Sequence, residues 1–324
     1  MAHIEHPHLK AYAVTAVNLP SQTAKDYRAQ VENLRTQLLK KIEADPDYGF
    51  VKTLQSGSVR KGTALKSTSD VDLAVYVEKA EAPTANDAQL VSWMAKRLRE
   101  AFPQLKDEQF KEEAHCVTLT YVGSGLSVDA VPVLYDGAAD NIGDLVNKHT
   151  GARVRTSVSQ HLEFIRARKN AHPEHFAQVV RLAKQWVKHM KRTEGETFRF
   201  KSFMVELILA HLADSGQAFA NYPDALEAFF DYIADTGLQE RISFTDFYSA
   251  SKLPAGSVGA IEIFDPVNAD NNVAAQYTDA QRRMIVGAAG DAADAISEAR
   301  YSDTKDRAVK RWQSVFGTTF KGNL

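Results

Sequence analysis

The sequence has very little cysteine, no long hydrophobic run and almost no net charge. Its one cysteine, Cys116, excludes an intrachain disulfide and a multi-cysteine zinc site. No segment reaches the roughly 18 consecutive apolar residues of a membrane-spanning helix, and the N-terminal residues lack the apolar core of a secretory signal. With 39 Lys and Arg against 41 Asp and Glu, the net charge of -2 excludes the strong positive field of a non-specific DNA-coating protein. We therefore expect a cytoplasmic protein that does not associate with membranes.

The composition is otherwise that of a globular protein with two domains. Hydrophobic residues make up 44% and charged residues 25% of the 324 residues, and domains commonly contain about 150 residues each. The hydrophobic periodicity changes near residue 157, from mixed strands and helices to helices alone. The predicted fold class is therefore α+β, with domains at residues 1–156 and 157–324.

Apolar residues at helical spacing predict a long helix over residues 21–45, with Ser21 as its N-cap. The other elements expected in the first domain are strands at 50–54, 71–77, 115–121 and 126–133, a loop at 55–69 and a helix at 86–102. The last two strands flank a glycine-containing link that is typical of a hairpin. In the second domain we expect helices at 157–169, 173–191, 201–214, 223–235 and 278–300, and irregular structure at 251–277.

Two aspartates on one strand are the first chemical signal. Asp70 and Asp72 alternate with apolar residues, so both carboxylates lie on the same strand face. A third carboxylate, Asp129 on a neighbouring strand, can complete a site for Mg²⁺ or Mn²⁺, which prefer hard oxygen ligands. Two such ions, about 3.5–4 Å apart, clamp the attacking hydroxyl and the leaving pyrophosphate of a nucleotidyl transfer. A lone pair of this kind is more often a solvated strand face, so the rest of the pattern matters.

A glycine-serine turn precedes the aspartates. Gly57 allows close backbone approach, and Ser58 adds a hydroxyl, so the turn can contact a triphosphate. Gly57 and Gly62 have the spacing of the glycines in a Walker A motif. Thr63 stands where that motif has lysine, so a P-loop is not expected.

The combination resembles a known family. The sequence resembles the signature of the DNA polymerase β-type nucleotidyltransferase superfamily at Gly57-Ser58, residues 61–63, residues 69–73 and Asp129. Within this superfamily, the chain is similar to the oligoadenylate synthetase and cGAS/DncV-like branch, which includes the bacterial CD-NTases of anti-phage signalling. The similarity lies in residues 181–186 with 201–207, and in residues 263–266 with 271–273. The resemblance covers about residues 21–300.

The resemblance implies a small mixed-sheet lobe and a mainly helical lobe, with the active site in the cleft between them. It implies that Asp70, Asp72 and Asp129 hold two metal ions. It further implies that the donor triphosphate is bound by Gly57, Ser58, Lys184 and Ser202, and that the base stacks on Phe203. The branch often has tyrosine at position 203, whereas phenylalanine stacks without donating a hydroxyl hydrogen bond. Without the resemblance, Lys184 would be expected to face solvent and Phe203 to lie in the core.

The implied function is a metal-dependent enzyme that joins NTPs, ATP foremost, into a cyclic oligonucleotide messenger. A HORMA-domain or other protein activator is implied in the same way. Direct activation by DNA is not expected, because the cysteine/histidine zinc insert of vertebrate cGAS is missing. The alternatives are a linear oligoadenylate synthetase, a tRNA CCA-adding-type enzyme and a catalytically silent nucleotide- or RNA-binding scaffold. The three aspartates argue against the scaffold.

Overall fold

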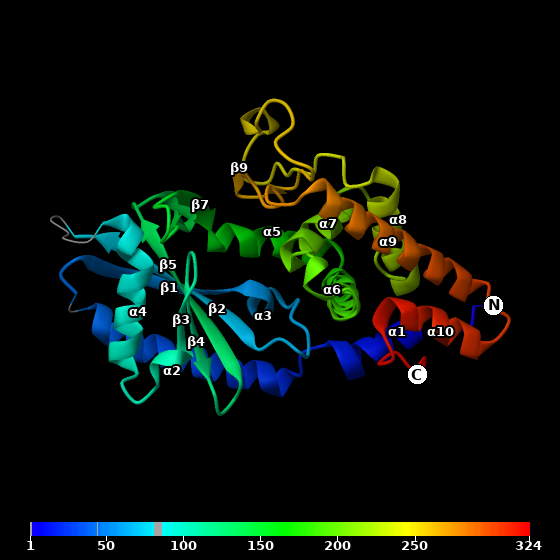
Figure 1. Ribbon diagram of the computed structural model, residues 1–324, viewed down its shortest axis with the longest axis horizontal. Coiled ribbons are helices and arrows are strands. Elements are labelled where there is room, and N and C mark those ends of the chain that lie inside the picture. Colours follow the sequence, from blue (N-terminus) through cyan, green and yellow to red (C-terminus); the bar gives the residue numbers. More distant parts are fainter. Residues whose placement is uncertain (1, 44, 81–85) are drawn as a thin grey trace. The chain divides into compact units, whose positions relative to one another are not determined.

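The computed structural model describes residues 2–43, 45–80 and 86–324 (Figure 1). Its contacts divide the chain into two compact units. The sheet unit comprises Leu19–Gly62 and Ser67–Glu163, and the helical unit comprises Met1–Asn18, Thr63–Lys66 and Phe164–Leu324. The sequence placed the N-terminal residues and residues 63–66 in the first domain. They pack with the helices instead, because residues such as Leu9 and Val17 are buried in the helical core.

One mixed sheet organises the sheet unit. Its strands within the described residues are β1 Tyr48–Ser56, β2 Asp70–Lys79, β3 Phe110–Glu112, β4 Val117–Tyr121, β5 Leu126–Tyr135, β6 Ile142–Val146 and β7 Arg153–Ser157. The strand order is β1-β2-β5-β4-β3, with β6 paired to the end of β5 and β7 paired to β6. The β2–β5 pair is parallel, and the other printed pairs of this sheet are antiparallel.

Both faces of the central strand β2 are covered. The helices α2 (Ser21–Ile42) and α4 (Leu90–Ala101) pack together and against the sheet. On β2, Ala74 and Tyr76 pack with Val158, the first residue of α5 (Val158–Ala171). The single buried face expected for this strand is therefore wrong beyond Asp72. The predicted cap of α2 is also wrong by one residue, because Pro20, with an extended ψ of 142°, occupies the N-cap position and Ser21 is already helical.

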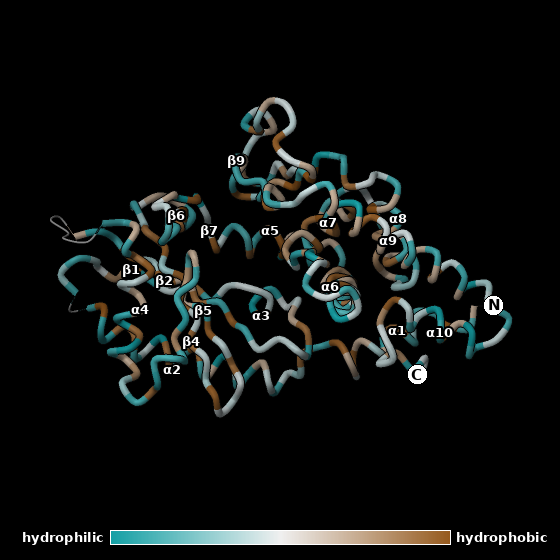
Figure 2. The backbone as a smooth tube through the Cα atoms, in the orientation of Figure 1, coloured by the Kyte–Doolittle hydropathy of each residue, from teal (hydrophilic) through white to brown (hydrophobic). Residues whose placement is uncertain are grey.

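The helical unit is built around an aromatic core. Its main helices are α1 His6–Tyr12, α6 His175–Thr193, α7 Ser202–Asp214, α8 Tyr222–Thr236, α9 Asp279–Arg300 and α10 Lys305–Phe316. The Trp186 ring meets Phe198 and Phe230 edge-on, at centroid distances of 5.9 and 4.8 Å, which is a favoured aromatic geometry. Figure 2 shows hydrophobic and hydrophilic residues alternating along α9 and α10, as expected of helices with one buried face.

The predicted elements are present, but several short ones and one twelve-residue helix, α10, were missed. Missed elements are α1, the five-residue helix α3 Gly57–Lys61 inside the predicted loop, strands β3, β6 and β7, the hairpin of β8 Phe264–Asp265 with β9 Asn268–Asn272, and α10. Short strands carry too few residues for a reliable periodicity, and their pairing depends on distant partners. No helix within the described ranges is both long and apolar enough to cross a membrane.

Candidate active site

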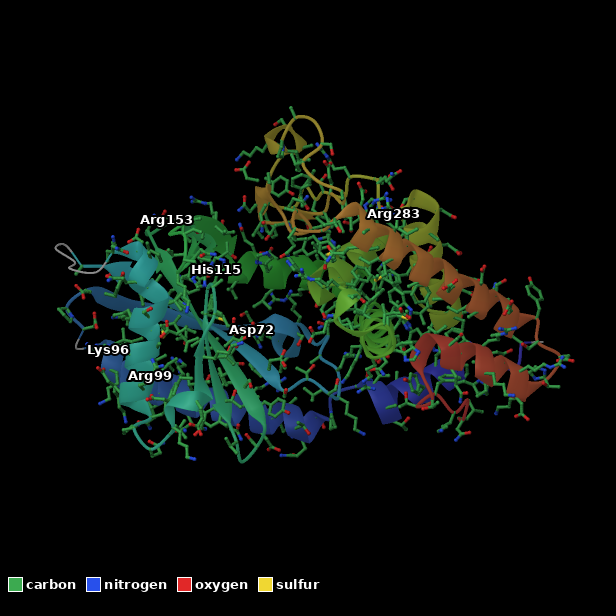
Figure 3. The ribbon with its side chains drawn as sticks, in the orientation of Figure 1. Asp72, Lys96, Arg99, His115, Arg153 and Arg283 are labelled. Atoms are coloured by element: carbon green, nitrogen blue, oxygen red, sulfur yellow. The ribbon has the colours of Figure 1, made fainter. Side chains whose placement is uncertain are left out.

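The parallel pairing of β2 with β5 sets the geometry of the predicted carboxylates. Its register aligns Asp72 with Asp129 and Asp70 with Ser127. Side chains alternate between the two faces of a sheet, and neighbouring strands lie about 4.8 Å apart. Asp70, Asp72 and Asp129 are therefore gathered on one face, from two adjacent strands (Figure 3, where Asp72 is labelled).

Asp129 is the most perturbed of the three carboxylates. Burial raises its pKa, and the negative charges of Asp70 and Glu113 raise it further. Thr118, which lies opposite Asp129 on β4, donates a hydrogen bond of 2.6 Å to Oδ1 and opposes this rise. The repulsion among these carboxylates is of the kind that a bound cation relieves.

The donor set suits a hard divalent cation. All three predicted ligands are carboxylates, which Mg²⁺ and Mn²⁺ accept. Burial, with the charge of Asp129 next in effect, raises the pKa of the nearby Cys116 thiol to about 12, which keeps this thiol neutral at neutral pH. Across the described ranges, no three His, Cys, Asp or Glu side chains are gathered closely enough to hold an ion by themselves. A cation here would take further ligands from substrate and water, as Mg²⁺ commonly does.

Gly57 forms part of the wall around Asp72. It follows β1 directly and has a φ of +70°. A Cβ atom at this position would lie 1.7 Å from Asp72 Oδ2 and 2.8 Å from its Cγ. Only glycine therefore lets the backbone approach this carboxylate. Ser58 follows on the first turn of α3 and is half-buried.

In the helical unit, Lys184 is buried, contrary to the expectation from its position on the helix alone. Its side chain is 4% exposed, and Nζ lies 2.6 Å from Glu206 Oε1, whose side chain is 3% exposed. Nζ also donates to Thr63 Oγ1 at 3.0 Å, and that hydroxyl donates to Glu206 Oε1 at 2.7 Å. Lys184, Glu206 and Thr63 thus form a closed, charge-assisted cluster.

This cluster holds the start of Thr63–Lys66, a segment that lies in the chain between two parts of the predicted site. Thr63–Lys66 connects the Gly57–Ser58 turn to the strand of Asp70 and belongs to the helical unit. The Lys66 N–H reinforces the anchorage by donating to the Val17 carbonyl at 2.6 Å. No role for Glu206 or Thr63 was evident from the sequence. Both residues lie in the stretches that carry the resemblance, but neither stretch by itself indicates that their side chains form a hydrogen bond with each other.

The remaining predicted residues lie at the start of α7. Ser202 is the first residue of that helix and is exposed, and Phe203 is half-buried against the helical core. The structure therefore forms two groups of predicted residues, the carboxylates with Gly57 and Ser58 in the sheet unit, and Lys184, Ser202 and Phe203 in the helical unit.

Comparison with known proteins identifies the family. The model of the Second Messenger Oligonucleotide or Dinucleotide Synthetase domain matches residues 6–167. The chain is 48% identical over 320 residues to the cyclic AMP-AMP-AMP synthase of Escherichia coli strain MS 115-1, with 99% of each chain covered. The chain belongs to this synthetase family. It is also 30% identical to the CBASS oligonucleotide cyclase CdnC of Escherichia coli strain KTE188, over 97% of this chain and 96% of the relative.

Solved structures agree with this membership. Those of E. coli MS115-1 CdnC in complex with HORMA-deltaN and of the same protein with ATP each give a TM-score of 0.88 at 47% identity, covering 98% of this chain and 99% of the other. The GTP-bound DncV of Vibrio cholerae gives 0.74 at 10% identity, covering 98% of this chain and 96% of the other, which shows a shared fold. The predicted family, the α+β fold and a nucleotidyltransferase that makes cyclic oligonucleotides are confirmed.

Replacing Gly57 by alanine should disable this synthetase by displacing Asp72. The added Cβ has no room beside Oδ2, and an ångström-scale displacement of a reacting group costs on the order of a hundredfold in rate. Nucleotide turnover and thermal unfolding would be measured together. Gly125→Ala is the matched control, because Gly125 has a similar φ of +68° but open space around its Cβ position. Equal losses in both variants would attribute the effect to backbone strain and contradict the close approach.

Replacing Glu206 by glutamine should destabilise the protein by about 3–5 kcal/mol, because the buried Lys184 ammonium loses its charge partner. Urea unfolding measures this loss. The double variant Lys184→Met/Glu206→Leu should recover most of it, since an apolar pair replaces both buried charges. If Glu206→Gln unfolds at the wild-type urea concentration, the ion pair does not anchor this region.

Proposed function

We propose that the chain is a synthase of cyclic AMP-AMP-AMP in anti-phage defence. The carrying observation is the 48% identity, over 99% of both chains, to the cyclic AMP-AMP-AMP synthase. The related CdnC structure with ATP supports ATP as the substrate. In the proposed reaction, a ribose hydroxyl of one nucleotide attacks the α-phosphorus of the next, a new P–O bond forms, and pyrophosphate leaves. Repetition and ring closure yield the cyclic product.

Asp70, Asp72 and Asp129 are the residues that would hold two Mg²⁺ ions, with Mn²⁺ as a substitute. Their common sheet face and their all-oxygen donor set support this assignment. When bound, the ions supply Lewis-acid stabilisation of the attacking and leaving oxygens. We assign Asp129 to the acceptor side, where its carboxylate would take the proton of the attacking hydroxyl and pass it to solvent. The hydrogen bond from Thr118 would keep Oδ1 oriented during this step.

We assign donor binding to the residues that the resemblance names. The close backbone approach at Gly57 and the neighbouring Ser58 hydroxyl support a phosphate contact there. We assign a second phosphate contact to Ser202 and Lys184, and base stacking to the half-buried Phe203 ring. For this contact, Lys184 Nζ would exchange a bond to Glu206 or Thr63 for one to the phosphate. In Lys184→Met/Glu206→Leu, a phosphate role for Lys184 would appear as weaker NTP binding by a folded protein, which a purely structural role would not produce.

We further propose a HORMA-domain protein as activator, since the related CdnC forms a complex with HORMA-deltaN at 47% identity to this chain. Mass spectrometry of products made from all four NTPs, with Mg²⁺ and with and without a HORMA protein, tests the function. We expect a ring of three adenylate units that phosphatase leaves intact. A product with phosphatase-sensitive ends would identify a linear synthetase, and the absence of pyrophosphate release would identify a silent scaffold.

Replacing both Asp70 and Asp72 by asparagine should lower turnover by on the order of a thousandfold or more, if the ions supply ~4 kcal/mol or more of transition-state stabilisation. Without metal, the melting temperature should hold or rise, because two like charges are removed from the cluster. Asp107→Asn is the control, since its side chain is 91% exposed and it lies outside the cluster. Wild-type turnover in a folded double variant would refute the assignment.

A further inference from the structure

Three basic side chains line a hollow of about 380 Å³ in the helical unit. Lys191 comes from the last turn of α6, while Arg199 and Lys201 come from the segment that leads into α7. Tyr277 contributes to the wall and accepts a hydrogen bond of 3.0 Å from the Lys201 backbone N–H. We call this hollow the basic pocket. It is lined by helical-unit residues, and none of them is a residue assigned to the reaction.

The cations of the basic pocket lack acidic partners. Among the described residues, Lys191, Arg199 and Lys201 make no ion pair, and Lys201 Nζ donates only to the Val273 carbonyl, at 3.4 Å. Glu196 is the one carboxylate residue that lines the hollow. Elsewhere in the same unit, a buried cation is neutralised: Arg168 pairs with both Asp214 and Asp246.

The positive charges of the basic pocket also repel one another. Desolvation by the surrounding protein lowers the pKa of Lys191 and of Lys201, although both residues remain exposed to solvent, and the Arg199 guanidinium lowers both further. The 13-residue helix α7 begins directly after Lys201, so the positive end of its dipole adds to the same field. An anion in the hollow would relieve the repulsion that the three cations exert on one another.

We propose that the basic pocket binds a diphosphate or triphosphate group. Three cations that line one hollow match the several negative charges of such a group, whereas a single carboxylate would leave most of the positive charges uncompensated. The limited volume of the hollow fits a small molecule, either free pyrophosphate or a nucleotide that carries the same group.

Calorimetric titration with tripolyphosphate, pyrophosphate and ADP tests this proposal. The parent protein is Asp70→Asn/Asp72→Asn, studied with EDTA, so that binding through divalent cations is removed. Adding Lys191→Gln and Arg199→Gln should eliminate one binding site or weaken it by on the order of a hundredfold, since two charge-assisted contacts are lost. Both side chains are exposed, so the variant should fold, which a thermal melt verifies.

The matched control is Lys310→Gln/Arg283→Gln, which removes the same charges from exposed positions of the same unit. Equal affinities for pyrophosphate and ADP would assign the pocket to the free diphosphate group, and tighter ADP binding would assign it to a nucleotide. No binding by the parent, or an equal loss in the control, would overturn the proposal. No turnover is measured, so such a result leaves the synthase assignment untouched.

Discussion

The parallel hydrogen-bonded pairing of β2 with β5 is the constraint on which the site depends. A slip of one residue would align Asp72 with Val128 or Ala130 and turn Asp129 away from the β2 carboxylates. Val128 and Ala130 on β5 are fully buried and alternate with the half-buried Ser127 and Asp129, so the same slip would exchange buried apolar side chains for polar ones. The free energy of burying those residues therefore fixes the place of the carboxylates. Hydrophobic packing of the neighbouring residues thus holds mutually repelling charges together.

A second constraint acts on the chain between Ser58 and Asp70. Thr63 is tied to the Lys184–Glu206 ion pair, so the connection between the glycine-serine turn and the aspartate strand is anchored in the helical unit. Burying an ion pair costs desolvation energy, so its net contribution to stability is small, and in some proteins such a pair instead specifies a unique arrangement. Here the arrangement it specifies is the path of the chain into β2.

The sequence was informative where the signal was local. Alternation along one strand placed Asp70 and Asp72 on a common face, and Asp129 on a nearby predicted strand offered a third carboxylate. The change of periodicity near residue 157 predicted the α+β architecture, and the family resemblance implied the metal-binding role of the three carboxylates. The burial of Lys184 could not be read in this way, because a lysine on a helix usually faces solvent and its partner Glu206 stands on another helix. The same holds for β6 and β7, whose five-residue strands exist through pairing with each other and with β5. Interactions between residues distant in the chain were missed, even where both residues lay in recognised motifs.

The central claim is that the β2–β5 register creates the metal-binding centre. Crystals grown with Mn²⁺ and a non-hydrolysable ATP analogue test it most directly through anomalous scattering. The account predicts two anomalous peaks about 3.5–4 Å apart, with Asp70, Asp72 and Asp129 as the protein ligands. Manganese bound elsewhere, with these three carboxylates making no contact to it in a nucleotide-loaded protein, would contradict the account.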